Sequence, residues 1–185
     1  MTDKAPSLAR IEGARLALRL IEPSDAEYVY GLRTDPAMNT HLSEVRGIAE
    51  DQRNWIIGYK NRERAGTEYY YVIERLSDGE RCGLVRLYDI ASDSFTWGSW
   101  MLDGNKPPKA ALESAVQIYR IGFGLLGCNR AVFDVRKDNL RTLAFHRRFG
   151  AEEIGADYIN AYFEYSRQQF EEVDLPRYQA VLMIK

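Results

Sequence analysis

Residues 100–150, WMLDGNKPPKAALESAVQIYRIGFGLLGCNRAVFDVRKDNLRTLAFHRRFG, decide the fold. The stretch predicts a strand that ends at Met101 and Leu102, a turn over 103–109 and a long helix from about Pro107. A second strand over 131–135 and a short basic helix from Asn139, which ends at Gly150, follow. A helix N-terminus that is open to anions, placed between two strands, is suited to holding a phosphorylated cofactor against a sheet.

The chain on either side of this stretch also has clear local signals. A strand over 15–21 precedes a helix to about residue 32, for which Ser24 and Glu27 form a capping-box pattern. Residues 43–64 predict one helix or two short ones. Strands over 68–74, 81–90 and 94–102 form an antiparallel meander, in which Gly98 marks a bulge or a close backbone approach. Beyond residue 150 we expect strands over 152–155 and 161–165, and a helix from about 167.

The central helix over 107–126 has an apolar stripe, and Gly127 is suited to ending it. Gly122 and Gly124 each lower its helix propensity by roughly 1 kcal/mol relative to Ala. We therefore expect close packing or fraying around these two glycines.

Composition excludes several classes of protein. The 185 residues fit one domain, and a net charge of −2 does not indicate a general nucleic-acid surface. Residues 130–148 carry six basic and two acidic side chains, which suits an anionic cofactor or a solvated helix face. Cys82 and Cys128 have no metal or disulfide spacing, so we expect two buried thiols and no metal. With no secretory or membrane-spanning segment in sight, we expect a cytoplasmic protein.

The order of these elements resembles that of the Gcn5-related N-acetyltransferase (GNAT) family. The most specific part is VRKDNLRTLAFHRRFGA over 135–151, and the resemblance extends over about 15–165. It implies a single α/β (α+β) domain over 1–185, with a mixed, mostly antiparallel sheet of about seven strands flanked by helices. The sheet would splay at two central parallel strands, those ending at Leu102 and Val135.

The resemblance also implies acetyl-CoA as the cosubstrate, in the splay and on the turn before the central helix. The cofactor-binding positions would be Met101, Leu102, Asn105, Lys106, Lys109, Ala110, Asn139 and Phe145. Pro107 and Pro108 depart from the family pattern and remove two N–H groups that could donate to a phosphate. The positive charges of Lys106 and Lys109 could attract the phosphate in their place. A proline-capped helix start without a ligand is the alternative. Asn139 would bond the pantetheine arm, cap its helix, or both.

The family reaction is the attack of a neutral amine on a thioester. His146 occupies the position at which many members carry a Tyr that protonates the leaving thiolate, and a charged imidazole could do this; simple packing is the alternative. The oxyanion would meet a backbone N–H near Met101. Asp134 and Glu164 are candidate bases, although each could be purely structural. We expect His41 to be solvent-exposed in its loop or to contact substrate. The pleat divides the side chains of 69–71 between the core and the other face of the sheet; those on the other face would line an acceptor pocket or pack, and we favour packing.

The sequence alone does not identify the molecule that accepts the acetyl group. Small-molecule N-acetylation is our first hypothesis, on an amino sugar or sugar nucleotide, because 95–100 and 133–139 are similar to acetyltransferases of such pathways. The opening RLALRLIEPSDA over 15–26 resembles instead the acetyltransferases of ribosomal-protein N-termini. A non-catalytic CoA-binding relative is the third alternative. We expect no nucleic-acid or membrane partner, and a chain that acts alone or as a homodimer.

Overall fold

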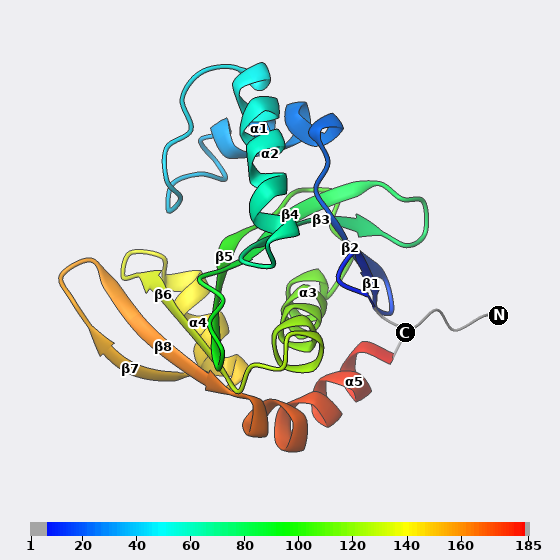
Figure 1. Ribbon diagram of the computed structural model, residues 1–185. Coiled ribbons are helices and arrows are strands. Elements are labelled where there is room, and N and C mark those ends of the chain that lie inside the picture. Colours follow the sequence, from blue (N-terminus) through cyan, green and yellow to red (C-terminus); the bar gives the residue numbers. More distant parts are fainter. Residues whose placement is uncertain (1–6, 184–185) are drawn as a thin grey trace.

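The computed structural model describes residues 7–183, and its centre is one eight-stranded sheet in the order β1-β2-β3-β4-β5-β6-β8-β7 (Figure 1). The strands are β1 (Arg10–Glu12), β2 (Leu16–Leu20), β3 (Tyr69–Arg75), β4 (Arg81–Tyr88), β5 (Ser94–Leu102), β6 (Arg130–Arg136), β7 (Glu152–Ala156) and β8 (Asn160–Ser166). The expected mixed, mostly antiparallel sheet is confirmed. It has eight strands because β1, too short to show a pattern, pairs with β2.

The sheet splays between β5 and β6, its one parallel pair. Only Ser94 with Arg130 and Phe95 with Ala131 are in register, so the strands separate towards their carboxyl ends. A bulge accompanies the separation, because β4 pairs through Leu84 with Met101 and then through Arg86 with Gly98. Ser99, inside the bulge, has φ 46°. The splay and the bulge beside Gly98 were both expected from the sequence.

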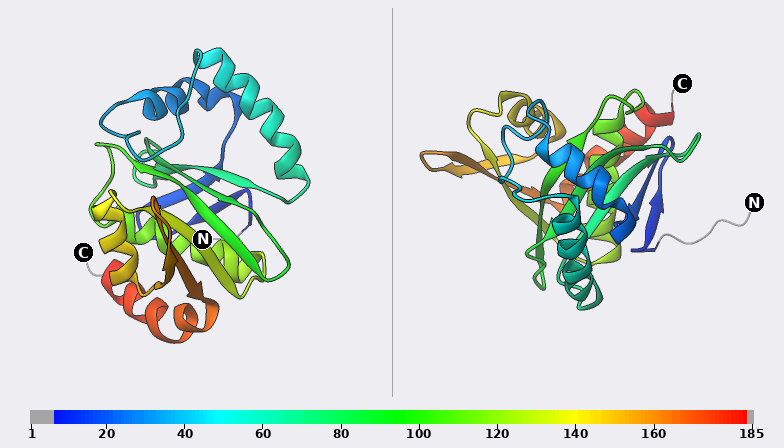
Figure 2. Two further views of the ribbon diagram at one scale, coloured as in Figure 1. Left: turned by 90° about the vertical axis from the view of Figure 1, so that its left-hand side faces the viewer. Right: turned by 90° about the horizontal axis from the view of Figure 1, so that it is seen from above.

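Helices cover both faces of the sheet (Figures 1 and 2). One face carries α1 (Ala26–Thr34) and α2 (Ala49–Arg64); the other carries α3 (Ala110–Tyr119), α4 (Leu140–Phe149) and α5 (Leu175–Met183). Tyr69 and Tyr71 belong to the core beneath α3, and Tyr70 belongs to the core beneath α1 and α2. All three are buried, so this run packs the cores and does not line an acceptor pocket.

Several helix ends differ from their predicted positions. The central helix begins at Ala110 rather than Pro107, because Lys109 takes a left-handed conformation with φ 66°. The Ser24–Glu27 capping box is wrong: the carboxylate of Asp25 accepts a hydrogen bond from the Glu22 N–H at 2.9 Å and is held by Arg19. The second helix begins only at Ala49, so 35–48 is a long loop.

Glycines have the expected effects around α3 and α4. A Cβ at Gly122 would overlap with the ring of Phe95, whereas at Gly124 it would meet nothing within 4 Å. The expected close packing is therefore at Gly122, and the helix widens into a π-helical turn over Arg120–Leu125. Gly150 ends α4 with φ 113°, a conformation that residues with a side chain rarely adopt.

Candidate functional site

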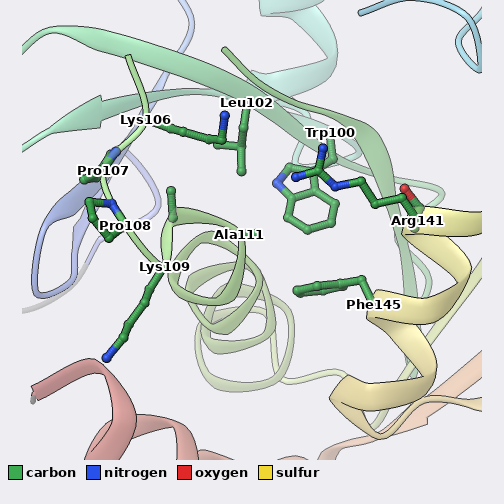
Figure 3. Close-up of a pocket in the computed structure, with 11 residues that line it drawn as sticks. Trp100, Leu102, Lys106, Pro107, Pro108, Lys109, Ala111, Arg141 and Phe145 are labelled. Atoms are coloured by element: carbon green, nitrogen blue, oxygen red, sulfur yellow. The ribbon is translucent and has the colours of Figure 1, made fainter. Parts of the chain in front are cut away.

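A cavity of about 580 Å³ lies where β5 ends and α3 begins (Figure 3). We call it the turn cavity. Its walls come from β5 (Trp100 and Leu102), the turn and first residues of α3 (106–111), and α4 (Arg141, Thr142 and Phe145). Of the predicted cofactor residues, it therefore brings together Leu102, Lys106, Lys109, Ala110 and Phe145.

The turn cavity is cationic. Lys106, Lys109 and Arg141 line it, and no Asp or Glu does. The ammonium of Lys109 is directed towards α5, where it donates a hydrogen bond to the Val181 carbonyl at 2.7 Å (Figure 3). The other two cations of the lining are Lys106, whose ammonium donates to the Asp103 carbonyl at 3.2 Å, and Arg141. Arg141 belongs to the basic stretch noted in the sequence, but its place in this wall was not foreseen.

Backbone donors are present at the start of α3 despite the two prolines. The Ala110 N–H donates to the Pro107 carbonyl at 3.2 Å, and the Glu113 N–H donates to the Lys109 carbonyl at 3.0 Å. Between them, the N–H groups of Ala111 and Leu112 have no acceptor within residues 7–183. The first turn of α3 can therefore donate to an anion one turn later than Pro107 and Pro108 would suggest.

A second cavity, of about 570 Å³, lies in the splay between β5 and β6, and we call it the splay cavity. Residues of 38–43, the end of β4, the bulge of β5, β6 and α4 line it. The part of the loop after α1 that contributes to this wall is Met38, His41, Leu42 and Ser43. Trp100 and Thr142 line both cavities, so the two are neighbours.

Trp100 separates the two cavities. Its indole N–H donates to the Ser114 hydroxyl at 3.1 Å, and its ring centroid lies 4.9 Å from that of Phe145. These contacts hold the ring between the two cavities, both of which it lines. In the sequence, only an aromatic residue beside the bulge points to this role.

His146 lies in the wall of the splay cavity and is buried, with 4% of its surface exposed. Aromatic rings surround it, with the ring centroids of Phe133 and Trp97 at 4.5 and 5.2 Å. Burial lowers the pKa of His146 from 6.5 to about 3, and its Nδ1 has no hydrogen-bond partner within 7–183. The imidazole is therefore neutral near pH 7 and can donate from one nitrogen and accept at the other.

Carboxylates also reach the splay cavity. Asp134 of β6 and Asp89, which follows β4, both line it, and neither carboxylate has a partner within the described residues. Asp89 was not singled out from the sequence, because an acidic residue in a turn is common. Glu164 lies outside this cavity, and its carboxylate is 3.2 Å from the Arg130 guanidinium.

The remaining predicted site residues lie around the two cavities. Asn139 lines the splay cavity, and its side-chain oxygen accepts the Thr142 N–H at 3.2 Å, so it caps α4. Met101 lies between Trp100 and Leu102, with its side chain buried in the core under α1 and α2. Asn105 lines neither cavity; its carbonyl accepts a bond from Arg75 at 3.0 Å.

His41 is half-buried. It lines the splay cavity, with its Nδ1 3.2 Å from a carboxylate oxygen of Asp138. The expectation of a solvent-exposed loop histidine is thus replaced by one that is within reach of a bound acceptor.

The two cysteines are buried free thiols, as expected, and burial raises the pKa of both. Over the range 7–183 no group of three His, Cys, Asp or Glu side chains is arranged to hold a metal ion. Nor does any helix in that range have the length and apolar character needed to cross a membrane.

Comparisons with known proteins agree with this arrangement. The acetyltransferase (GNAT) domain family matches residues 15–152. Apo FdhC, described as a nucleotide-linked sugar GNAT, is 38% identical, with a TM-score of 0.85 over 92% of this chain and 97% of that one. Spermidine N-acetyltransferase from Vibrio cholerae, in complex with CoA and spermine, is 15% identical, with a TM-score of 0.73 over 85% of this chain and 99% of that one.

Ribosomal-protein-S5-alanine acetyltransferase from Vibrio fischeri is 14% identical, with a TM-score of 0.72 over 85% of this chain and 96% of that one. At such identities the last two likenesses show the fold alone. No curated protein sequence matches the chain significantly.

The chain belongs to the GNAT family. It is an acetyltransferase that uses acetyl-CoA as its cosubstrate.

Proposed function

We propose that this protein transfers the acetyl group of acetyl-CoA to the amino group of an amino sugar that is carried on a nucleotide. The observation that carries the proposal is the 38% identity, over almost the whole chain, with a protein described as a nucleotide-linked sugar GNAT. The splay cavity supports a small acceptor, because about 570 Å³ lies within the usual range for small-molecule sites.

In this proposal the turn cavity holds the cofactor. Lys106, Arg141 and the free N–H groups of Ala111 and Leu112 would bind its phosphates. Phe145 would pack against the pantetheine arm, and Asn139 would bond it while capping α4. The thioester would then reach the splay cavity beside Trp100.

The splay cavity would hold the acceptor amine. We assign the carboxylate of Asp134 as the group that removes a proton from the acceptor's ammonium, directly or through water, so that the neutral amine can attack; this carboxylate has no competing partner within the described residues. The amine nitrogen bonds to the thioester carbon, and the N–H of Met101 would stabilise the resulting oxyanion. The carbon–sulfur bond then breaks and releases the CoA thiolate, and the proton that the nitrogen loses on becoming an amide passes to the thiolate directly or through water.

The role of His146 follows from its pKa. With a pKa of about 3, the charged imidazole is too scarce near pH 7 to serve as an acid. We therefore assign the neutral imidazole as a hydrogen-bond donor to the departing sulfur. His146→Phe should lower kcat about 100-fold, as the loss of one preorganised donor typically does. His146→Tyr, which restores a donor, should be less impaired; equal turnover in His146→Phe and the wild type would remove this residue from the mechanism.

An acceptor panel tests the proposed function. Release of CoA thiol would be measured with nucleotide-linked amino sugars, free amino sugars, spermidine and a peptide with an N-terminal alanine. The nucleotide-linked amino sugars should have the highest kcat/KM. A preference for the peptide or for spermidine would refute the proposed acceptor. Undetectable CoA binding by calorimetry would refute acetyl transfer from acetyl-CoA as the activity of this protein.

We also propose that the protein works in the cytoplasm, as a monomer or a homodimer. Its free buried thiols support a reducing compartment. Light scattering on the purified chain distinguishes the two states, because the mass of one chain is 21.3 kDa.

A further inference from the structure

A third cavity, of about 390 Å³, lies between α1, the loop over 35–48, α2 and β4. We call it the arginine cavity, because Arg33, Arg46 and Arg86 line it. Ser43 and Arg86 line the splay cavity as well, so the arginine cavity adjoins the proposed acceptor site. Its helices α1 and α2 lie across the sheet from α3 (Figures 1 and 2).

Arg33 is the most unusual of the three arginines. Only 8% of its surface is exposed, and it forms no ion pair with a carboxylate of the described chain. Its Nη2 donates to the carbonyl and the hydroxyl of Ser43, at 3.1 and 2.8 Å, and its Nε has no acceptor. A buried guanidinium without a counter-ion is costly, and an anionic ligand in the cavity would compensate it.

The other charged side chains of the arginine cavity are compatible with a bound anion. Arg86 is held from behind by the buried carboxylate of Glu68, at 2.6 Å. Arg46 pairs with Glu44 at 3.0 Å, but both side chains are well exposed, so that pair costs little to break. Asp51 is already used, since it accepts the N–H of Ile48 at 2.8 Å.

Gln52 and Trp55 give the arginine cavity a second kind of recognition. Gln52 is 8% exposed, and its side-chain amide has no hydrogen-bond partner within the described residues. An amide offers both a donor and an acceptor, which suits the edge of a nucleobase or a ribose. Trp55, 37% exposed, adds an aromatic ring that is held by Tyr59 at a centroid distance of 5.8 Å.

We propose that the arginine cavity binds the nucleoside diphosphate of the acceptor, with Arg33 and Arg86 on the phosphates and Gln52 on the nucleoside. The proposal rests on the proposed function, and it deepens it by assigning the nucleotide to residues of this chain. Guanidinium groups pair bidentately with phosphate oxygens, and Arg86, which lines both cavities, places this subsite next to the cavity in which the sugar amine would react. A polyamine would instead face an unpaired arginine.

Binding of UDP, dTDP, GDP and CDP tests the subsite. Each is titrated calorimetrically into the protein saturated with CoA, so that the turn cavity is filled. At least one should bind, and Arg33→Lys and Gln52→Leu should each weaken it at least tenfold. Arg53→Ala is the matched control, because it removes a charge from the outer side of α2, beside Glu50, and lies outside this cavity; its affinity should equal that of the wild type.

Two results would overturn the subsite. The first is that none of the four nucleotides binds at millimolar concentration; the second is that both cavity variants, folded as judged by thermal melting, bind as the wild type does. Kinetics separates this proposal from the proposed function. If the subsite is correct, the same variants raise KM for the nucleotide-linked sugar and leave kcat/KM for the free amino sugar unchanged. Nucleotide binding with the predicted variant pattern, in a protein that acetylates no amino sugar, supports the subsite and refutes only the proposed acceptor.

Discussion

Burial of His146 should make the stability of this protein depend on pH. The folded state holds the pKa of His146 at about 3, whereas an unfolded chain has the ordinary value of 6.5. A proton therefore binds the unfolded state first as the pH falls, so the stabilisation is present above pH 6.5 and is lost progressively below it, towards pH 3. Each pH unit changes the free energy of unfolding by about 1.4 kcal/mol, and pH 5 lies 1.5 units below 6.5, so the loss between pH 7 and pH 5 is about 2 kcal/mol.

Comparison with His146→Phe isolates this effect. Phe keeps a ring among the surrounding aromatic side chains but cannot bind a proton. Urea unfolding at pH 5 and pH 7 should give a fall in unfolding free energy that is about 2 kcal/mol smaller in the variant than in the wild type. His41→Asn, which removes the other histidine, should retain the dependence that comes from His146. Parallel pH profiles for the wild type and His146→Phe would refute the argument that this imidazole is buried in the neutral form.

Three further predictions concern the base, the cofactor and the core. Asp134→Asn should lower kcat/KM by a factor of about 100, with a smaller loss at high pH where the free amine is more abundant; full activity near neutral pH would exclude it as the base. Arg141→Ala should weaken CoA binding about tenfold in calorimetry, through one lost charge-assisted contact, whereas Arg147→Ala, whose partner is Glu153 outside the turn cavity, should not. Gly122→Ala should destabilise the fold by about 1–3 kcal/mol in urea unfolding because of the overlap with Phe95, whereas Gly124→Ala should be neutral or slightly stabilising; equal stabilities would contradict that packing.

The order of the elements could be predicted because its signals are local. Gly150 ends α4 and Asn139 begins it through contacts within four residues, so both are visible in the sequence. The start of α3 could not be predicted in the same way. Pro107 is favourable at a helix start, but the left-handed turn at Lys109, whose ammonium bonds Val181 on α5, delays that start to Ala110. The position of the free amides thus depends on a backbone turn that no pattern in the sequence marks.

The candidate site was predictable only where a family pattern marks it. His146 and Asn139 lie in such a pattern, and both line the splay cavity. Arg33, Gln52 and Arg86 carry no local signal, because they come from α1, α2 and β4 and meet only in the folded chain. The sequence could not show that His146 is neutral either. Its low pKa comes from burial among aromatic rings of β5, β6 and β8, which are far apart in the sequence.

The short register between β5 and β6 has a mechanical consequence. Only two in-register pairs, Ser94 with Arg130 and Phe95 with Ala131, join strands β1 to β5 to the three strands β6, β8 and β7. These pairs lie at one end of β5 and β6. The two parts of the sheet are therefore joined at residues 94–95 and 130–131 and are furthest apart near Leu102 and Val135, the ends of the two strands. A pantetheine arm that lies between the separated strand ends would contact both strands. Backbone amides at residues 100–102 and 133–136 should therefore exchange hydrogen more slowly when CoA is bound, while those at residues 94–95 and 130–131 stay unchanged.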